Sequence, residues 1–220
     1  LIATGFPVSL RLGTAAIFLA LIFGSIIGSV AALNQNSKLD YSVMFFGMIG
    51  ISIPNFVMAP LLVLFFSIGL KALPAGGYNG GDFYHMVLPV VSLALPQMAY
   101  IARLTRGSMI EVLSSNFVRT AKAQGLPTRS ILLKHVLKPT LLPVVSYLGP
   151  ATAAIITGSV VVEQIFGLPG LGRYFVQGAL NRDYTLVMGV VVFYGCLIIL
   201  FNLIVDTLYG FIDPRIKQNR

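Results

Sequence analysis

Long uncharged apolar runs alternate with short polar segments along the whole chain. Five runs carry no Asp, Glu, Lys or Arg, over residues 12–33, 41–70, 83–102, 139–162 and 184–205. Each has about 20 residues or more, enough for a helix to cross the roughly 30 Å hydrocarbon core of a bilayer. Lipid offers no partner for backbone polar groups, so such runs are expected to be helical. The pattern predicts one all-α membrane domain over residues 1–220, with five transmembrane helices at about 9–33, 41–70, 84–113, 139–164 and 184–210.

Two of these runs carry features that shape helices. Small residues recur at every fourth position of the first run, at Ala16, Ala20, Gly24, Gly28 and Ala32. Such a stripe lets helix backbones approach closely in lipid, either within the bundle or at a subunit interface. The second run is longer than a bilayer core, and Pro54 and Pro60 predict a kink in it.

Composition and charge fix the expected orientation. The chain is 56% hydrophobic and 10% charged, whereas about a quarter of the residues of a soluble domain are charged. The formal net charge is +8, and most basic residues lie in the turn at 34–40, the loop at 103–138 and the C-terminal tail. The positive-inside rule places these segments, and the C-terminus, in the cytosol. Because the basic residues sit at helix ends, topology explains them, and we expect no nucleic-acid partner.

The orientation leaves the first residue outside. The chain begins without Met, a positive flank or a signal peptide, so we expect a further span upstream and a longer protein. The single cysteine, Cys196, lies in the last run. We interpret it as a small packing residue, because a lone cysteine defines no disulfide framework.

A short helix is predicted inside the long basic loop. Residues 114–116 are N-cap types, residues 117–124 favour a helix, Gly125 suits the turn that ends it, and Pro127 blocks continuation. Helical spacing puts Phe117, Ala121 and Gln124 on one face. Thr128 is expected to cap a second short helix that leads to Pro139. Two such helices with a sharp corner form a rigid projection; the alternative is an amphipathic elbow that only connects two spans.

The loop also carries a family resemblance. Its segment Arg119-Thr-Ala-Lys-Ala-Gln-Gly125 resembles the EAA loop of ABC-importer permeases, which has Glu-Ala-Ala, three residues and Gly. Further segments look like the dipeptide/oligopeptide family, with the closest likeness to its B-type subunits: residues 101–111, 116–126, 158–172, 181–184, 206–209 and 213–215. Arg119 and Thr120 stand where Glu and Ala are usual, and His135 and Lys138 replace the Ile and Pro of an Ile-x-Leu-Pro ending. With these departures the loop can still couple the permease to a partner ATPase, but a salt bridge made by the usual Glu is not available to it.

The resemblance implies a type I ABC-importer permease core with a cytosolic coupling helix at about residues 116–125. It implies a multi-pass subunit of the bacterial inner membrane that forms half of a pathway for oligopeptides or dipeptides. The implied partners are a homologous second permease, two cytosolic ATPases that bind ATP and Mg, an extracytoplasmic peptide-binding protein and the lipid bilayer. The implied ATPase-coupling residues are Asn116, Phe117, Arg119, Thr120, Ala121, Lys122, Gln124 and Gly125.

The energy source is expected to lie in a partner. The sequence has no G-x-x-x-x-G-K-[ST] phosphate loop and no ionisable residue at mid-span. Asp206 lies near the cytosolic end of the last run, where we expect it to reach headgroups or Arg103 and Arg106. No catalytic arrangement, cofactor site or metal cluster is expected, since His85 and His135 lie on opposite sides of the membrane.

A second candidate site lies near the outer face. Glu163, Arg173, Arg182 and Asp183 could form an outer gate or a docking surface for the binding protein, or only local ion pairs. A short helix near Gly172–Leu180 is expected beside them. Three other functions stay open on the sequence: import of nickel or another small solute on the same scaffold, a gradient-driven carrier, and a non-transport membrane scaffold.

Overall fold

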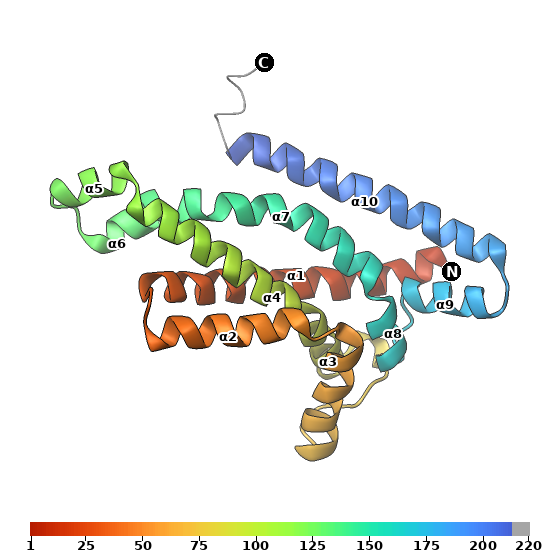
Figure 1. Cartoon of the computed structure of the whole chain (residues 1–220). Coiled ribbons are helices and arrows are strands. Elements are labelled where there is room, and N and C mark those ends of the chain that lie inside the picture. Colours follow the sequence, from red (N-terminus) through yellow and green to blue (C-terminus); the bar gives the residue numbers. More distant parts are fainter. Residues whose placement is uncertain (213–220) are drawn as a thin grey trace.

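The computed structural model describes the backbone of residues 1–212 and the side chains within it, except at 157–158, 206 and 208–212. The described regular structure is helical (Figure 1). The α-helices are α1 (Ile2–Leu33), α2 (Lys38–Ser52), α3 (Asn55–Leu62), α4 (Phe83–Ser114), α5 (Asn116–Ala123), α6 (Thr128–Ser130), α7 (Leu137–Gly158), α8 (Val160–Phe166), α9 (Leu171–Leu180) and α10 (Tyr184–Ile212). Val63–Gly69 and Ile131–Val136 are π-helical, and Asn79–Gly81 is a 3-10 turn. The predicted all-α class is confirmed.

Four helical segments of the described chain are long and apolar enough to cross a membrane: Ile2–Leu33, Phe83–Ser114, Thr128–Ile156 and Tyr184–Val205. The fifth expected span is a pair of helical arms, Lys38–Ser52 and Asn55–Gly69, with a bend of 107° between them. Ile53 is extended and Pro54 begins the second arm, because a residue before proline avoids the helical conformation. The kink predicted at Pro54 is therefore confirmed, and α3 leaves the direction of α2 (Figure 1), whereas Pro60 lies within α3.

The stripe of small residues on α1 packs against α4. All five of its members are buried. A Cβ at Gly24 would lie 2.8 Å from the Met98 carbonyl oxygen and 2.9 Å from the Ile101 side chain, so the two backbones approach as closely as small residues permit. The stripe thus serves packing within the bundle, the first of the two interpretations that the sequence left open.

Two predicted boundaries are wrong. Thr128 does not cap a separate short helix: Pro127 is the N-cap residue, no side chain caps the helix, and residues 128–156 form one continuous helical segment. The π-helical turn Ile131–Val136 precedes Pro139, and the Leu137 N–H bonds to Leu132, so the hydrogen-bond register has already changed where proline lacks its donor. The fourth span also stops early, because α7 ends at Gly158 and α8 starts at Val160.

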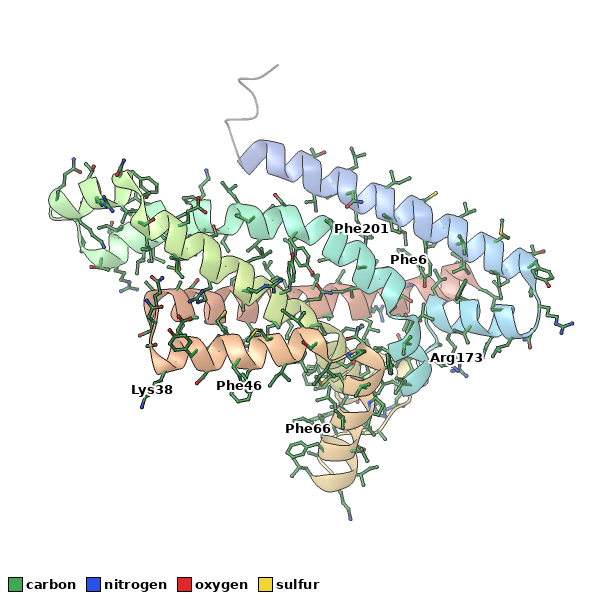
Figure 2. All side chains as sticks on the ribbon, viewed as in Figure 1. Phe6, Lys38, Phe46, Phe66, Arg173 and Phe201 are labelled. Atoms are coloured by element: carbon green, nitrogen blue, oxygen red, sulfur yellow. The ribbon has the colours of Figure 1, made fainter. Side chains whose placement is uncertain are left out.

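The two ends of the bundle carry different segments. The α1–α2 turn, α5 and α6 gather at one end, which we call the α5 end, and α8, α9 and the N-terminus gather at the other, the α9 end (Figure 1). Lys38 and Arg173 lie at opposite ends of the molecule (Figure 2). The loops that the sequence assigns to opposite sides of the membrane are therefore separated along the bundle.

Candidate functional site

The α5 projection, which we define as residues 115–127, is a sharply bounded helical corner. It begins at Ser115, which is extended and makes no side-chain cap; the Ser115 hydroxyl instead donates to the Val112 carbonyl. It ends in a Schellman turn, in which Gly125 N–H bonds to Lys122 O at 3.0 Å and Leu126 N–H to Ala121 O at 3.3 Å. Gly125 has φ +77°, so its predicted role at the end of the helix is confirmed.

A small hydrophobic cluster holds the projection against the bundle. Val118 and Ala121 of α5 are buried with Met109 of α4 and with Ile131 and Val136 of the helix that follows. Of the three residues that spacing puts on one face, Ala121 is buried, whereas Phe117 is 48% exposed and Gln124 is also exposed. The three-residue spacing of Val118 and Ala121 gives the buried face. Anchoring at both ends makes α5 a rigid projection from the bundle.

The outward surface of the projection is basic and polar. Every predicted coupling residue except Ala121 is exposed, namely Asn116, Phe117, Arg119, Thr120, Lys122, Gln124 and Gly125. Phe117 is the large apolar side chain among them. This surface offers one aromatic anchor surrounded by hydrogen-bonding and cationic groups, the composition typical of residues that bind a protein partner.

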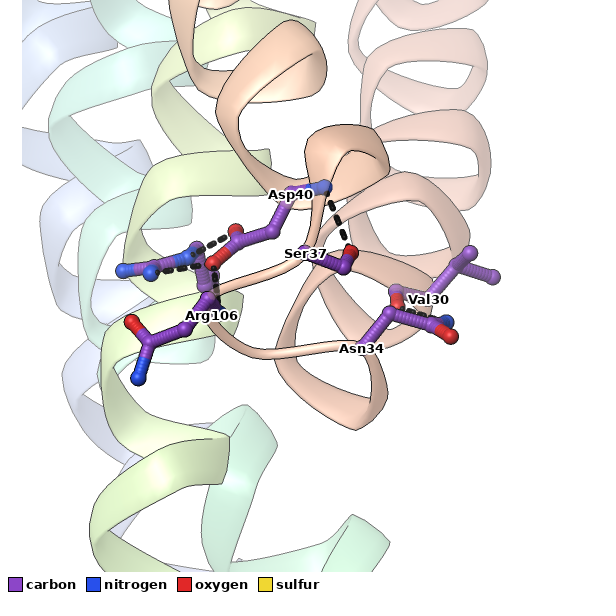
Figure 3. Close-up of polar contacts among 6 residues, drawn as sticks. Val30, Asn34, Ser37, Asp40 and Arg106 are labelled. Carbon is purple, nitrogen blue, oxygen red and sulfur yellow. Dashed lines mark hydrogen bonds and ion pairs between the residues drawn. The ribbon is translucent and has the colours of Figure 1, made fainter.

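A buried ion pair lies at the same end of the bundle (Figure 3). Asp40 is fully buried and accepts hydrogen bonds from Arg106 Nε at 2.5 Å and Nη2 at 2.7 Å, and from the Asn36 N–H at 2.9 Å. Ser37 caps α2 by accepting from the Asp40 N–H at 3.2 Å. The pair fastens the first turn of α2 to α4. Sequence reasoning missed it, although Ser37 followed three residues later by an acid is a capping signal.

This pair corrects the expectation for Arg106. The sequence predicts that Asp206 reaches headgroups or Arg103 and Arg106, but the Arg106 guanidinium is bidentate on Asp40. The side chain of Asp206 and the C-terminal basic residues Arg215, Lys217 and Arg220 lie outside the described residues.

At the α9 end, Glu163 forms the centre of a buried hydrogen-bond network. Its Oε1 accepts from the hydroxyls of Ser9 at 2.7 Å and Ser159 at 2.6 Å. Its Oε2 accepts from the N–H groups of Gly172 at 2.8 Å and Arg173 at 3.3 Å. The Ser9 hydroxyl in turn accepts from the Leu171 N–H at 2.8 Å. We call these residues the Glu163 network.

The network supplies hydrogen-bond acceptors for the backbone N–H groups in the first turn of α9. The first N–H groups of a helix have no partner within it, and a carboxylate there also favours the positive end of the helix dipole. Ser9 comes from α1, Ser159 from the break after α7, and Glu163 from α8. One side chain therefore joins four elements at this end of the bundle.

Comparison with known proteins gives the family. The sequence model of the family described as "Binding-protein-dependent transport system inner membrane component" matches residues 24–218. The chain belongs to this family. The predicted family resemblance is confirmed, and this binding-protein-dependent transport component is a multi-pass membrane protein.

Curated relatives and solved structures agree with this assignment. The oligopeptide transport system permease protein OppB of Haemophilus influenzae is 58% identical over 99% of this chain and 71% of its own length. The dipeptide transport system permease protein DppB of Bacillus subtilis is 49% identical over 98% of this chain and 70% of its own. An inward-facing structure of the MetNI methionine ABC transporter matches with a TM-score of 0.80 at 18% identity, over 97% of this chain and 96% of that one. This last likeness confirms the predicted fold.

In this transport component the predicted outer residues do not form one cluster. The Arg173 guanidinium donates to the Gly167 carbonyl at 3.4 Å, and Asp183 accepts from the Leu186 N–H at 3.0 Å at the start of α10. Arg182 is exposed in the left-handed conformation, with φ 58°. Among the described residues an ion pair joins Arg106 to Asp40, and the His85 ring contacts the Asp82 carboxylate at 3.2 Å. The interpretation of the outer residues as local ion pairs is therefore wrong, whereas their role as gate or docking surface stays a prediction.

Glycines around the Glu163 network are required by close approach. A Cβ at Gly170 would overlap the Glu163 carboxylate, and one at Gly172 would overlap the Val160 backbone. We expect Gly172→Ala to lower the free energy of unfolding by about 2 kcal/mol, because a well-packed site must shift to admit a methyl group. The thermal unfolding midpoint of the purified complex measures the loss. Gly195→Ala is the matched control, since a Cβ there meets no atom within 4 Å; equal midpoints for both variants would contradict the packing argument.

Proposed function

We propose that the chain is the permease subunit of a binding-protein-dependent ABC importer of oligopeptides or dipeptides, without an ATPase site of its own. The observation that carries the proposal is the 58% identity with an oligopeptide permease protein over 99% of the chain. A 49% identical relative named for dipeptide transport supports the wider substrate class. The fold likeness to an ABC importer permease agrees with it.

The proposal includes the partners. A homologous second permease completes the pathway, an extracytoplasmic binding protein delivers the peptide, and two ATPases bind ATP and Mg in the cytosol. The α5 end faces the cytosol, as does the C-terminus, and the α9 end faces outward. The exposed apolar side chains of α2, α3 and α10 supply a surface for lipid and for the second permease.

In this proposal the α5 projection receives the mechanical input. An ATPase groove holds Phe117 and its polar surround, and ATP binding draws the two ATPases together. Val118 and Ala121 are packed on α4 and on the helix that leads into α7, so a displacement of α5 moves both spans. The bundle then changes between inward-facing and outward-facing states, with the ATPase groove as the differential contact. Hydrolysis resets it.

Uptake by reconstituted vesicles tests the transport function. Import of tri-alanine should require ATP inside, both ATPases and the binding protein, and vanadate should abolish it. Uptake that survives vanadate but stops with an ionophore would favour a gradient-driven carrier instead.

The variant Gly125→Val tests whether the α5 projection transmits the mechanical input from the ATPases. A β-branched residue at φ +77° is strained by about 1–2 kcal/mol, so the Schellman turn should open and the projection should lose its shape. We expect peptide-stimulated ATP hydrolysis to fall about tenfold, which corresponds to about 1.4 kcal/mol. Co-purification of the ATPases reports whether their binding is lost as well.

Gly80→Val is the matched control for this variant. Gly80 has φ +69° in the loop before α4, and a Cβ there also meets no atom within 4 Å. The backbone strain is the same in kind but lies far from α5. Equal loss of stimulated hydrolysis in the two variants would show that strain anywhere in the chain, rather than the projection, is the cause.

A further inference from the structure

The exposed surface of the bundle is divided into two chemically different parts. Large apolar side chains are exposed along α1, α2, α3 and α10, as lipid contact requires; examples are Phe18, Phe23, Phe46, Met188 and Ile199. In residues 85–116 and 134–160, by contrast, no described large hydrophobic side chain is exposed. These ranges contain most of α4 and all of α7, which pack against each other.

Within these two ranges the exposed positions of α4 and α7 are polar residues, small residues or prolines, whereas Phe83 and Tyr84 at the start of α4 are exposed aromatic residues. The exposed positions within the two ranges include Arg103, Gly107, Glu111, Ser146 and Ala154. We call this surface the α4–α7 face. Polar and ionisable groups are costly against hydrocarbon and normally face a protein interior or a water-filled cavity. The α4–α7 face is therefore not a lipid-facing surface.

Helix geometry places the polar part of α4 away from α1 and α2. Met98, Ile101 and Thr105 approach the glycines of α1, and Ala99 approaches Gly50 of α2. Residues three and seven apart share a helix face, so Tyr100, Arg103 and Gly107 lie together. At 100° per residue this face points away from the one that packs on α1.

Four side chains on the α4–α7 face form a connected group, the α4–α7 cluster: Gln97, Tyr100 and Arg103 of α4 and Tyr147 of α7. The Tyr147 hydroxyl donates to Gln97 Oε1 at 2.5 Å. The rings of Tyr100 and Tyr147 stack with centroids 4.3 Å apart. The Arg103 guanidinium carbon lies 5.1 Å from the centre of the Tyr100 ring, a distance at which a cation is attracted to the ring.

The cluster keeps unused hydrogen-bonding capacity. Within the described residues, neither the Gln97 amide nitrogen, the Tyr100 hydroxyl nor the Arg103 guanidinium has a hydrogen-bond partner, and Arg103 has no carboxylate partner. Arg106, one turn further along α4, is by contrast held by Asp40. Arg103 thus presents a free cation beside an amide donor and two aromatic rings. A guanidinium fork matches a carboxylate, and amide and hydroxyl groups match a peptide main chain.

We propose that the α4–α7 face lines an aqueous passage and that the α4–α7 cluster binds the main chain and terminal carboxylate of a peptide in transit. The inference deepens the proposed function and rests on it. Arg103 engages the carboxylate, Gln97 and Tyr100 engage main-chain groups, and the stacked rings form a platform for side chains of different size. Such a site discriminates the ends of a peptide rather than its sequence.

Cysteine accessibility tests the passage. In the complete transporter carrying Cys196→Ser, single cysteines replace Ser146 and Ala154 on the α4–α7 face, with Leu203→Cys and Ile199→Cys on the exposed apolar surface of α10 as controls. A charged thiol reagent needs a hydrated thiolate, so we expect labelling at least about tenfold faster on the α4–α7 face. Saturating tri-alanine should slow that labelling. Equal rates at all four positions would overturn the aqueous passage.

Uptake of two probes tests the binding site. Wild type, Arg103→Gln and the exposed control Arg11→Gln are reconstituted with the other subunits, and import of tri-alanine and of tri-alanine amide is measured for each. Relative to wild type with the same probe, Arg103→Gln should lower tri-alanine uptake about tenfold and amide uptake less than about twofold. Arg11→Gln should change neither.

Other outcomes of the uptake experiment would contradict either the binding site or the proposed function. Equal loss of both probes in Arg103→Gln, or a loss that appears only in vesicles with phosphatidylglycerol and not in pure phosphatidylcholine, would assign Arg103 to a lipid phosphate and overturn the site. Unchanged uptake of both probes would overturn it as well. If wild type imports neither probe, the proposed function itself has failed and the inference falls with it.

Discussion

Replacing Glu163 with alanine is expected to lower the free energy of unfolding by about 4 kcal/mol, because it removes the acceptor for several buried donors at once. Buried donors left without a partner cost about 1–3 kcal/mol each, and these costs are not additive. The groups that lose their acceptor are the N–H groups of Gly172 and Arg173, whereas the hydroxyls of Ser9 and Ser159 lose their bonds to the carboxylate but keep the carbonyls of Gly5 and Ile156 as second acceptors. The unfolding midpoint of the purified complex should fall by about 10 °C.

Glu163→Gln should give an intermediate loss of about 2 kcal/mol. All four partners of Glu163 donate, whereas glutamine offers one oxygen and places an NH₂ group against two donors. The exposed neighbour Gln164 supplies the control, since Gln164→Ala should stay within about 0.5 kcal/mol of wild type. A midpoint for Glu163→Gln that equals wild type would mean that the network does not hold α9.

The Glu163 network also shows where sequence reasoning stops. From the sequence, Glu163 is a charged residue at the outer end of one span, and Ser9 is a residue of another span with no distinguishing feature. The hydrogen bond between them joins positions 154 residues apart. Neither periodicity nor charge pattern encodes such a pair, because it depends on how α1, α8 and α9 pack. The glycines at 167, 170 and 172 were visible as turn signals, but not as a space for a carboxylate.

Local rules were reliable where the chain interacts with itself over a few residues. The apolar runs predicted the helices, Pro54 predicted the kink, and Gly125 predicted the end of α5. The same rules failed where packing against neighbouring elements determines which residues are buried or where a helix breaks. Spacing grouped Phe117 with Ala121 but did not identify Val118, which is buried beside Ala121 against Ile131 and Val136. The break at Ser159 was likewise missed, since the apolar pattern continues through it.

Relatedness to known proteins and the chemistry of the exposed surface indicate different properties of this chain. High identity to permease proteins identifies the class of protein, whereas the distribution of exposed side chains separates a lipid surface from the α4–α7 face. Sequence similarity does not distinguish the lipid surface from the α4–α7 face, because the distinction depends on which side of each helix packs against other helices.

Breaking the Asp40–Arg106 pair is expected to cause the second large loss of stability. Arg106→Ala is expected to lower the free energy of unfolding by about 3–5 kcal/mol, because it leaves a buried carboxylate without its cation. Asp40 is fully buried, and Arg106 supplies two of its hydrogen bonds. Arg106→Lys keeps the charge but loses the bidentate fork, so it should cost about 1–2 kcal/mol. The unfolding midpoint of the complex measures both.

A double variant separates the cost of the stranded charge from the loss of packing. Adding Asp40→Asn to Arg106→Ala removes the unpaired carboxylate, so the double variant should be more stable than Arg106→Ala alone by at least about 1 kcal/mol. Lys38→Gln, in the same turn of α2 and exposed, should leave the midpoint unchanged. If the two substitutions simply add, the loss comes from the arginine's packing on the helices, and the ion pair does not fasten α2 to α4.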